Sequence, residues 1–291
     1  GSSLIALADD LQDGLYRYDA GEYDSAQKLL SPLAEQGNAI AQLILGSMHE
    51  LGKGVQQDYS EAAKWYKLSA EQGNAGAQNL LGLFFEKGRG FPQDYVEAVK
   101  WYQLSADQGY ALSQLFLGER YYLGQGVQQD FMEAAKWFEL AAMQGLKNAQ
   151  YSLGVMYYHG QGVEQNYQEA FNRYKLLALQ GHAKARYNLG LMYYHGQWVQ
   201  QNYKEAFKWF KLSSEQGVVV AQYNLGYFYD QGKGISQDCM KAFNLYELSA
   251  KQGNALAQSN LGLLYSLGKV VSKNHKEAAR WYRLSAEQGN K

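Results

Sequence analysis

Apolar side chains recur with helical spacing along almost the whole chain. In one representative segment, five of them fall at i, i+3, i+4, i+7 and i+8, namely Ala77, Leu80, Leu81, Phe84 and Phe85. This spacing gathers them on one side of a helix. Asn74 can cap the start of that helix, and Gly88 can adopt the left-handed backbone conformation that ends a helix. The pattern therefore predicts a first helix between Asn74 and Gly88.

A second helical pattern follows each short loop. Its apolar positions in the preceding segment are Tyr59, Ala62, Trp65, Tyr66 and Ala70. Asp58 and Glu61 have the spacing of a capping box, in which each side chain satisfies a backbone N–H at the helix start. Gly73 ends the helix before Asn74 opens the next segment. Each unit thus contains two antiparallel helices, and neighbouring units must stack because one pair cannot bury this apolar surface.

The two-helix unit repeats every 36 residues. Leu-Gly pairs mark the period at Leu45-Gly46, Leu81-Gly82, Leu117-Gly118, Leu153-Gly154, Leu189-Gly190, Leu225-Gly226 and Leu261-Gly262. The predicted units cover residues 38–73, 74–109, 110–145, 146–181, 182–217, 218–253 and 254–291. Residues 1–37 form a shorter variant that we interpret as an N-terminal capping repeat. We expect one continuous all-α domain, a solenoid of antiparallel helix pairs in which Gly46 and its equivalents let neighbouring helices approach closely.

Composition narrows the classes of function. Lys plus Arg number 27 and Asp plus Glu 28, so no excess of positive charge favours nucleic acid as a partner. No apolar run approaches the roughly 18 residues of a membrane-spanning helix. Cys239 is the only cysteine, so no disulfide forms within the chain. The Gly1-Ser2-Ser3 start has the look of a cloning remnant, so the lack of a leader says little about location.

No constellation of catalytic, metal or cofactor residues emerges. Ser-x-x-Lys occurs at Ser25 and at Ser266, but neither is accompanied by Ser-Asp-Asn or Lys-Thr-Gly. His159 and His195 occupy equivalent positions one repeat apart, and two ligands do not make a zinc site. The glycine-containing loops join two helices and follow no strand, which argues against a phosphate-binding motif. We therefore expect no enzyme activity, no metal and no cofactor.

The recurring pattern Ala-x-Ala-Gln-x-x-Leu-Gly-x-x-Tyr-x-x-Gly-x-Gly resembles the Sel1-like repeat over residues 38–291, and residues 1–37 resemble a tetratricopeptide-type unit. The resemblance implies a right-handed superhelical solenoid that acts as a protein-interaction adaptor. In bacteria such proteins often act in envelope assembly, cell-surface signalling or host interaction, so it favours a periplasmic or secreted location, with a cytoplasmic one also open. Trp198 and Val270 depart from the pattern by replacing a loop glycine.

By analogy with tetratricopeptide domains, one side of each first helix lines a concave groove. In the middle and late repeats this side carries tyrosine and asparagine ladders. Tyrosine offers apolar area with a hydrogen-bonding tip, an asparagine amide pairs with an extended peptide backbone, and Lys184 attracts a carboxylate. The predicted partner-binding residues are Tyr151, Tyr158, Lys184, Tyr187, Asn188, Tyr194, Tyr223, Asn224, Tyr227 and Asn260. In the early repeats, Glu50, Glu86 and Glu119 make the predicted groove acidic and favour a basic partner segment.

The function predicted from these residues is that of a protein-binding adaptor that takes a peptide or helix in its groove. Three alternatives stay open. The C-terminal repeat could dock onto a second copy and build a self-assembling scaffold. The tyrosines could stack on sugars in a glycan- or cell-wall-binding module. Alternatively, recent duplication copied the tyrosines from unit to unit, and the ladders bind nothing.

Overall fold

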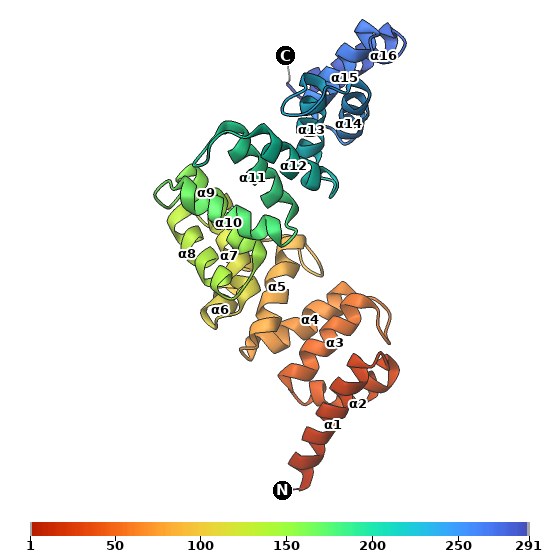
Figure 1. Cartoon of the computed structure of the whole chain (residues 1–291). Coiled ribbons are helices and arrows are strands. Elements are labelled where there is room, and N and C mark those ends of the chain that lie inside the picture. The colour runs from red at the N-terminus through yellow and green to blue at the C-terminus, as the bar shows by residue number, and fades with distance from the viewer. Residues whose placement is uncertain (1, 290–291) are drawn as a thin grey trace. The chain divides into compact units, whose positions relative to one another are not determined.

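The computed structural model describes residues 2–289, and all regular elements in that range are α-helices (Figure 1). They are α1 (Ser2–Asp19), α2 (Tyr23–Glu35), α3 (Ala39–Leu51), α4 (Tyr59–Glu71), α5 (Ala75–Lys87), α6 (Tyr95–Asp107), α7 (Ala111–Leu123), α8 (Phe131–Met143), α9 (Lys147–His159), α10 (Tyr167–Leu179), α11 (Ala183–His195), α12 (Tyr203–Ser214), α13 (Val219–Gln231), α14 (Cys239–Lys251), α15 (Ala255–Leu267) and α16 (His275–Glu287). The predicted all-α fold of paired helices is confirmed.

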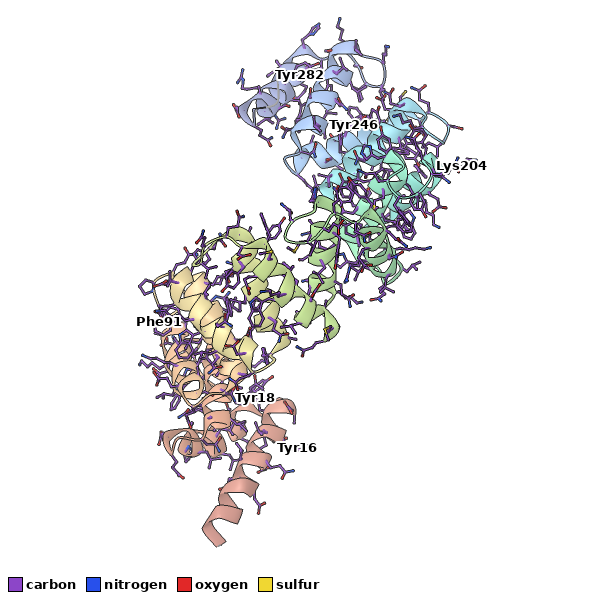
Figure 2. All side chains as sticks on the ribbon, turned by 90° about the vertical axis from the view of Figure 1, so that its left-hand side faces the viewer. Tyr16, Tyr18, Phe91, Lys204, Tyr246 and Tyr282 are labelled. Atoms are coloured by element: carbon purple, nitrogen blue, oxygen red, sulfur yellow. The ribbon has the colours of Figure 1, made fainter. Side chains whose placement is uncertain are left out.

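The helices fall into two compact units. Unit 1 contains α1 to α8, α9 as far as Leu153, and residues 161–163, whereas unit 2 contains the rest of α9 from Gly154 and all later helices. Consecutive helices pack against each other from α1 to α8 in unit 1 and from α10 to α16 in unit 2. Side chains line these helices throughout (Figure 2). That all the repeats form one continuous domain stays a prediction.

The helix boundaries arise from local capping, as the sequence indicates. The Asn74 side chain accepts a hydrogen bond from Ala77 N at the start of α5, and Gly88 ends α5 with a φ of 66°. Asp58 caps α4 by accepting from Ser60 N and Glu61 N at 2.8 and 3.0 Å. The predicted reciprocal bond of the capping box, from Asp58 N to the Glu61 side chain, is wrong. Asp58 N donates to the carbonyl of His49 in the preceding helix, a bond with an equivalent in all seven repeats.

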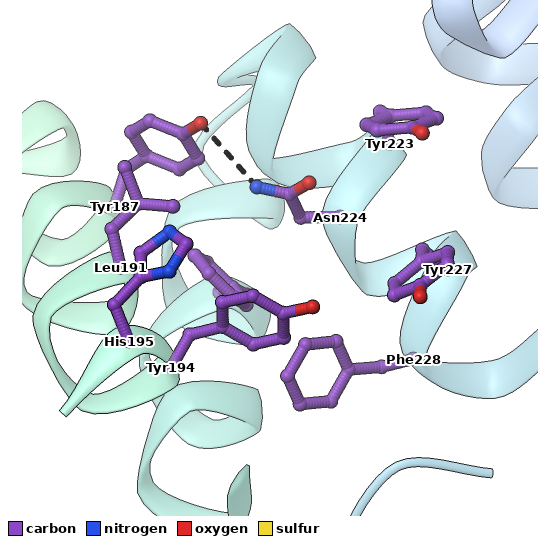
Figure 3. A pocket seen from close by; sticks show the side chains of 9 residues that line it. Tyr187, Leu191, Tyr194, His195, Tyr223, Asn224, Tyr227 and Phe228 are labelled. Carbon is purple, nitrogen blue, oxygen red and sulfur yellow. Dashed lines mark hydrogen bonds between the residues drawn. The ribbon is translucent and has the colours of Figure 1, made fainter. Parts of the chain in front are cut away.

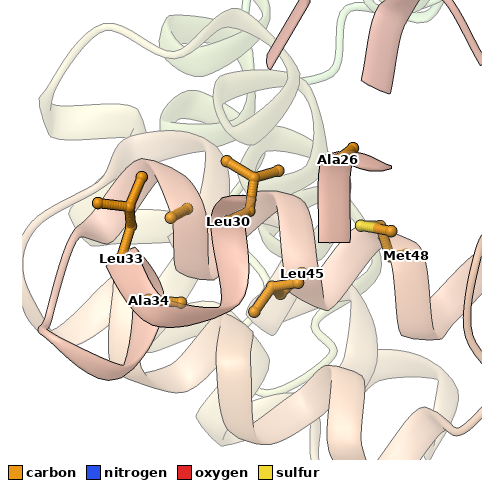
Figure 4. Packing of buried hydrophobic residues seen from close by; sticks show 7 residues of the cluster. Ala26, Leu30, Leu33, Ala34, Leu45 and Met48 are labelled. Atoms are coloured by element: carbon orange, nitrogen blue, oxygen red, sulfur yellow. The ribbon is translucent and has the colours of Figure 1, made fainter. Parts of the chain in front are cut away.

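The Leu-Gly glycines bring the two helices of one repeat into direct contact. A Cβ placed on Gly118 would lie 2.8 Å from two ring carbons of Phe138, and the other six Leu-Gly glycines face an aromatic ring in the same way. The ring of the second helix therefore occupies the space that a side chain would fill. Apolar clusters complete the packing between successive repeats, as with Leu30, Leu45 and Met48 (Figure 4).

Glutamine and serine side chains join the helices across the stack. Gln72 Nε2 donates to Gln42 Oε1 at 2.7 Å, and Gln42 Nε2 donates to the carbonyl of Ala34 at 3.0 Å. Ser69 Oγ donates to the carbonyl of Ala39 at 2.6 Å. Equivalent bonds recur in later repeats, for example from Gln252 and Ser249. These bonds satisfy polar groups that the stacking would otherwise bury without partners.

We predict that alkali unfolds the protein through its core tyrosines. Burial is the main cause that raises the pKa of Tyr66, Tyr102 and Tyr246 in the folded state. A raised pKa contributes stability that is complete below the unfolded value, about 10, and is lost as the pH rises above it. Absorbance at 295 nm should show one class of tyrosines that ionises only together with loss of the helical circular dichroism signal. Ionisation of all tyrosines with the helices intact would contradict this prediction.

Trp198 occupies a backbone conformation that favours glycine. Its φ is 65°, the only positive φ at a non-glycine position in the described residues, and 55% of its surface is exposed. Gly162 and Gly234 hold the equivalent loop position in neighbouring repeats with a φ of 69°. Val270 also replaces this glycine, but it is not among the residues with positive φ. Trp198 is therefore strained, whereas Val270 is not.

We predict that Trp198→Gly raises the stability of unit 2. Relief of the left-handed strain should increase the free energy of unfolding by about 1 kcal/mol. Val270→Gly is the matched control, and it should lower that free energy because it only adds backbone freedom. Urea titration followed by circular dichroism measures both variants. A lower unfolding midpoint for Trp198→Gly would show that the side chain contributes more than the strain costs.

Candidate ligand-binding pocket

A pocket of about 420 Å³ opens between helices of unit 2 (Figure 3). It is bounded by α11, α12 and α13, which belong to two successive repeats. Its lining residues are Tyr187, Leu191, Tyr194, His195, Phe210, Tyr223, Asn224, Tyr227 and Phe228. Six of these nine side chains are phenylalanine or tyrosine, so the pocket is an aromatic site with hydroxyl groups on its walls.

Periodicity explains why these residues meet. Tyr187 and Tyr223 are 36 residues apart, so they occupy the same position in successive first helices. The ring of Phe210 packs against Gly190 and therefore lies beneath these two tyrosines. Phe210 and Phe228 are each only 1% exposed and form the floor, whereas the tyrosines are half-buried and form the walls.

One wall carries a hydrogen bond between the two repeats. Asn224 Nδ2 donates to the hydroxyl of Tyr187 at 3.3 Å, as the dashed line in Figure 3 shows. Burial raises the pKa of Tyr187, and the bond from Asn224 partly opposes that rise. Burial likewise raises the pKa of Tyr223, which a side-chain hydrogen bond with Asn260 opposes. Each asparagine thus acts on the tyrosine of the preceding repeat.

A lysine borders the opposite wall. Lys233, in the loop between α13 and α14, donates from Nζ to the hydroxyl of Tyr194 at 2.9 Å. The same Nζ lies 4.9, 5.3 and 5.0 Å from the ring centres of Tyr194, Tyr203 and Tyr227. The hydrogen bond with Tyr194 is the main cause that raises the pKa of Lys233, so the ammonium stays charged at neutral pH. Three rings hold this cation beside the pocket.

The structure brings together half of the predicted residues. Tyr187, Tyr194, Tyr223, Asn224 and Tyr227 line the pocket. The other five do not line it, namely Tyr151, Tyr158, Lys184, Asn188 and Asn260. Lys184 is exposed on α11, and the cation that borders the pocket is Lys233 instead.

Several predicted groups also bind within the protein. The Tyr158 hydroxyl donates to Gln197 Oε1 in the loop of the following repeat, at 2.5 Å. The amide nitrogen of Asn224, expected to face a peptide backbone, is bound to Tyr187. These contacts hold neighbouring repeats together, which the groove analogy did not anticipate. The binding roles of the ten residues stay predictions.

The predicted partner-binding set missed five residues of this site. They are Leu191, His195, Phe210, Phe228 and Lys233. Phe210 and Phe228 belong to the core pattern, and their inner edges form the pocket floor. Lys233 stands between two loop glycines, Gly232 and Gly234. The signal that could have found it is that this loop position changes between lysine, arginine and glutamine from repeat to repeat.

The predicted acidic groove of the early repeats is largely neutralised. Glu50 accepts from the Tyr66 hydroxyl at 2.7 Å and pairs with Arg89 at 3.2 Å. Glu86 is only 7% exposed, and it pairs with Lys87 at 2.8 Å and with Arg120 at 3.5 Å. These carboxylates face inward because buried tyrosines donate to them. They therefore offer little negative charge to a basic partner.

Residues 2–289 contain neither a cluster of metal-ligating side chains nor a helix suited to span a membrane. No group of three or more His, Cys, Asp or Glu side chains in this range is arranged to hold a metal ion. Within the same range, none of the helices combines the length and apolar character needed to cross a membrane. The aromatic pocket is therefore the feature on which a functional proposal rests.

The stacked helical hairpins and the pocket between their first helices define a repeat protein of the solenoid class. The Sel1 repeat model matches residues 39–74, 75–110, 111–146, 147–182, 183–218, 219–254 and 255–290. The chain therefore belongs to the Sel1 repeat family. Proteins of this family are generally scaffolds for protein–protein interaction and are typically not enzymes.

Solved structures share the fold over nearly all of the chain. One is a protective antigen present in uropathogenic Escherichia coli strains, with 38% identity, a TM-score of 0.82 and 97% of this chain covered. This chain spans 62% of that protein's length. Another is a Sel1 repeat protein from Oxalobacter formigenes, with 31% identity and a TM-score of 0.76, covering 100% of this chain and 88% of that one. A comparison with curated proteins finds no match.

Proposed function

We propose that this chain is a protein-interaction scaffold that binds an extended peptide segment of a partner in the aromatic pocket of unit 2. The observation that carries the proposal is the pocket itself, about 420 Å³ in volume and lined by six phenylalanine and tyrosine rings from two successive repeats. Ligand sites are typically concave and mostly apolar with a few placed polar groups, and this pocket has that character.

The kind of lining favours a peptide. Tyrosine rings give a large contact area, lose little conformational freedom on binding, and offer hydroxyls to a peptide's polar groups. Tyr187 and Tyr223 repeat along the stack, so a segment that follows the repeats meets the same chemistry twice. That arrangement suits a peptide that places one apolar anchor side chain in the pocket, with peptide backbone on either side of it.

The test compares two tyrosines of the same ladder. Tyr223→Ala removes a pocket wall, whereas Tyr151→Ala removes the equivalent tyrosine two repeats earlier, outside the pocket. Peptides selected from a random-sequence display library on the unaltered chain should bind Tyr223→Ala more weakly by about 1 to 3 kcal/mol. Tyr151→Ala should bind them unchanged. Equal losses in both variants, or in neither, would reject the pocket, with circular dichroism confirming that both fold.

The bacterial setting is part of the proposal. The similarity to a protective antigen of uropathogenic E. coli supports the envelope, secreted or host-interaction role that the family resemblance implies. Localisation of the tagged protein by cell fractionation tests it, and recovery of all the protein from the cytoplasm would contradict it.

A further inference from the structure

We propose that the polar end of the aromatic pocket binds a carboxylate of the peptide, held by Lys233 together with the hydroxyl of Tyr194. The inference rests on the proposed function, which it deepens by naming the chemistry of the ligand. A side-chain carboxylate and a C-terminal carboxylate share that chemistry, and the experiment below separates them.

The first support is the position and charge of Lys233. Its Nζ is fixed beside the pocket by Tyr194, which accepts its hydrogen bond at 2.9 Å, and by the ring of Tyr227 at 5.0 Å. Both tyrosines line the pocket. Among the described residues, no carboxylate oxygen lies within 4.0 Å of this Nζ. A cation held at a pocket wall without a carboxylate of its own attracts an anionic ligand group.

The second support is the direction of the hydrogen bonds. The Tyr194 hydroxyl accepts from Lys233, so its own proton is directed elsewhere. A hydroxyl has a single proton to donate, and at Tyr194 that proton is left for a ligand. The pocket thus presents this donor beside the ammonium of Lys233, and the group that matches such a pair is a carboxylate.

A comparison with neighbouring repeats shows that this polarity is specific to one place. Tyr122 and Tyr158 occupy the same helix position as Tyr194, but each donates its proton to a glutamine of the following loop, Gln161 and Gln197. Lysine cannot accept a hydrogen bond, so Lys233 reverses the direction at Tyr194. Replacing Lys233 with glutamine would therefore give Tyr194 the arrangement of Tyr158, in a form that the fold already tolerates.

The contrast with other basic residues at the same loop position points the same way. Arg89 is paired with Glu50 at 3.2 Å, so its charge is already neutralised. Lys53 lies over the rings of Tyr18 and Tyr23 in unit 1. Lys269 is exposed in the last loop. Lys233 combines the free charge with the aromatic pocket, and Lys269 supplies a matched control.

Small probes test the inference without a known partner. N-acetyl-phenylalanine and its amide differ only in a terminal carboxylate, and N-acetyl-aspartyl-phenylalaninamide and its asparaginyl analogue differ only in a side-chain carboxylate. Binding is followed through the methyl resonances of Leu191, which lines the pocket. At least one acid should bind about tenfold more tightly than its amide, since a charge-assisted hydrogen bond is worth at least that factor. The acid that binds more tightly than its amide shows whether the bound carboxylate is C-terminal or belongs to a side chain.

The variants decide the role of Lys233. Lys233→Gln should remove the preference for the acid while leaving the binding of the amide unchanged, and Lys269→Gln should keep the preference. Equal binding of acid and amide to the unaltered chain would overturn the inference, as would a preference that survives Lys233→Gln. Failure of both acids to shift Leu191 would also overturn it. The proposed function stands or falls separately, on the comparison of Tyr223→Ala with Tyr151→Ala.

Discussion

Replacing Glu86 with alanine should lower the free energy of unfolding by about 3 kcal/mol, because it leaves the buried Arg120 without its carboxylate partner. Arg120 is 6% exposed, and its Nη1 lies 3.5 Å from Glu86 Oε2. The same carboxylate oxygen accepts from the buried hydroxyl of Tyr102 at 3.0 Å. Glu119 is 3.8 Å from Arg120 but more exposed, so it compensates only in part. Urea titration measures the loss.

A double variant separates the stranded charge from other causes. Met48, Met156 and Met192 occupy the position of Arg120 in other repeats. Glu86→Gln with Arg120→Met removes both charges and keeps an acceptor for Tyr102. This double variant should recover most of the stability, since replacing a buried ion pair by apolar groups is often neutral. A Glu86→Ala variant within 1 kcal/mol of the unaltered chain would show that the pair is well solvated.

Replacing Gly118 with leucine should also cost about 3 kcal/mol, at the upper end for overpacking of a core. The Cβ alone would lie 2.8 Å from ring carbons of Phe138, and the backbone carbonyl of Ala134 is 3.3 Å away. Neither the ring nor the helix backbone can withdraw, because Phe138 is 2% exposed. The result would be a separation of α7 from α8 or a displaced ring, and both lose packing in this repeat.

Gly76 provides a control of opposite sign. It also lies in a first helix, but the nearest atom to its added Cβ is the side-chain oxygen of Asn74 at 3.3 Å. The equivalent positions Ile40 and Leu256 carry large side chains behind the same asparagine cap, so the fold accepts them. Gly76→Ala should therefore stabilise by up to about 1 kcal/mol through helix propensity. Equal destabilisation by both glycine substitutions would contradict the packing account.

The helices and their boundaries could be predicted because their causes are local. Asn74 and Gly88 act within one turn of the helix ends they define, and the apolar spacing lies within a single helix. Because the pattern recurs every 36 residues, helices predicted correctly for one repeat are predicted correctly for all seven. Stacking follows from the apolar surface that a single pair leaves uncovered.

The details of the pocket could be predicted only in part, because they depend on contacts between repeats. The helix period places Tyr187 and Asn224 on corresponding sides of successive helices, but the sequence does not show that they bind each other. Lys233 reaches back 39 residues to Tyr194, a distance that no within-unit pattern encodes. The same holds for Arg120, which stands at an otherwise apolar position of its helix because Glu86 of the preceding repeat is there to pair with it.

The most direct measurement of the central claim is to locate a bound peptide by NMR. With methyl-labelled leucine, a peptide selected on the chain should shift the resonances of Leu191 and give nuclear Overhauser contacts to them. Leu263, which holds the same helix position two repeats later and is 47% exposed, should stay unchanged. Contacts to Leu68 or Leu104, which are exposed on second helices, with no change at Leu191, would contradict the account.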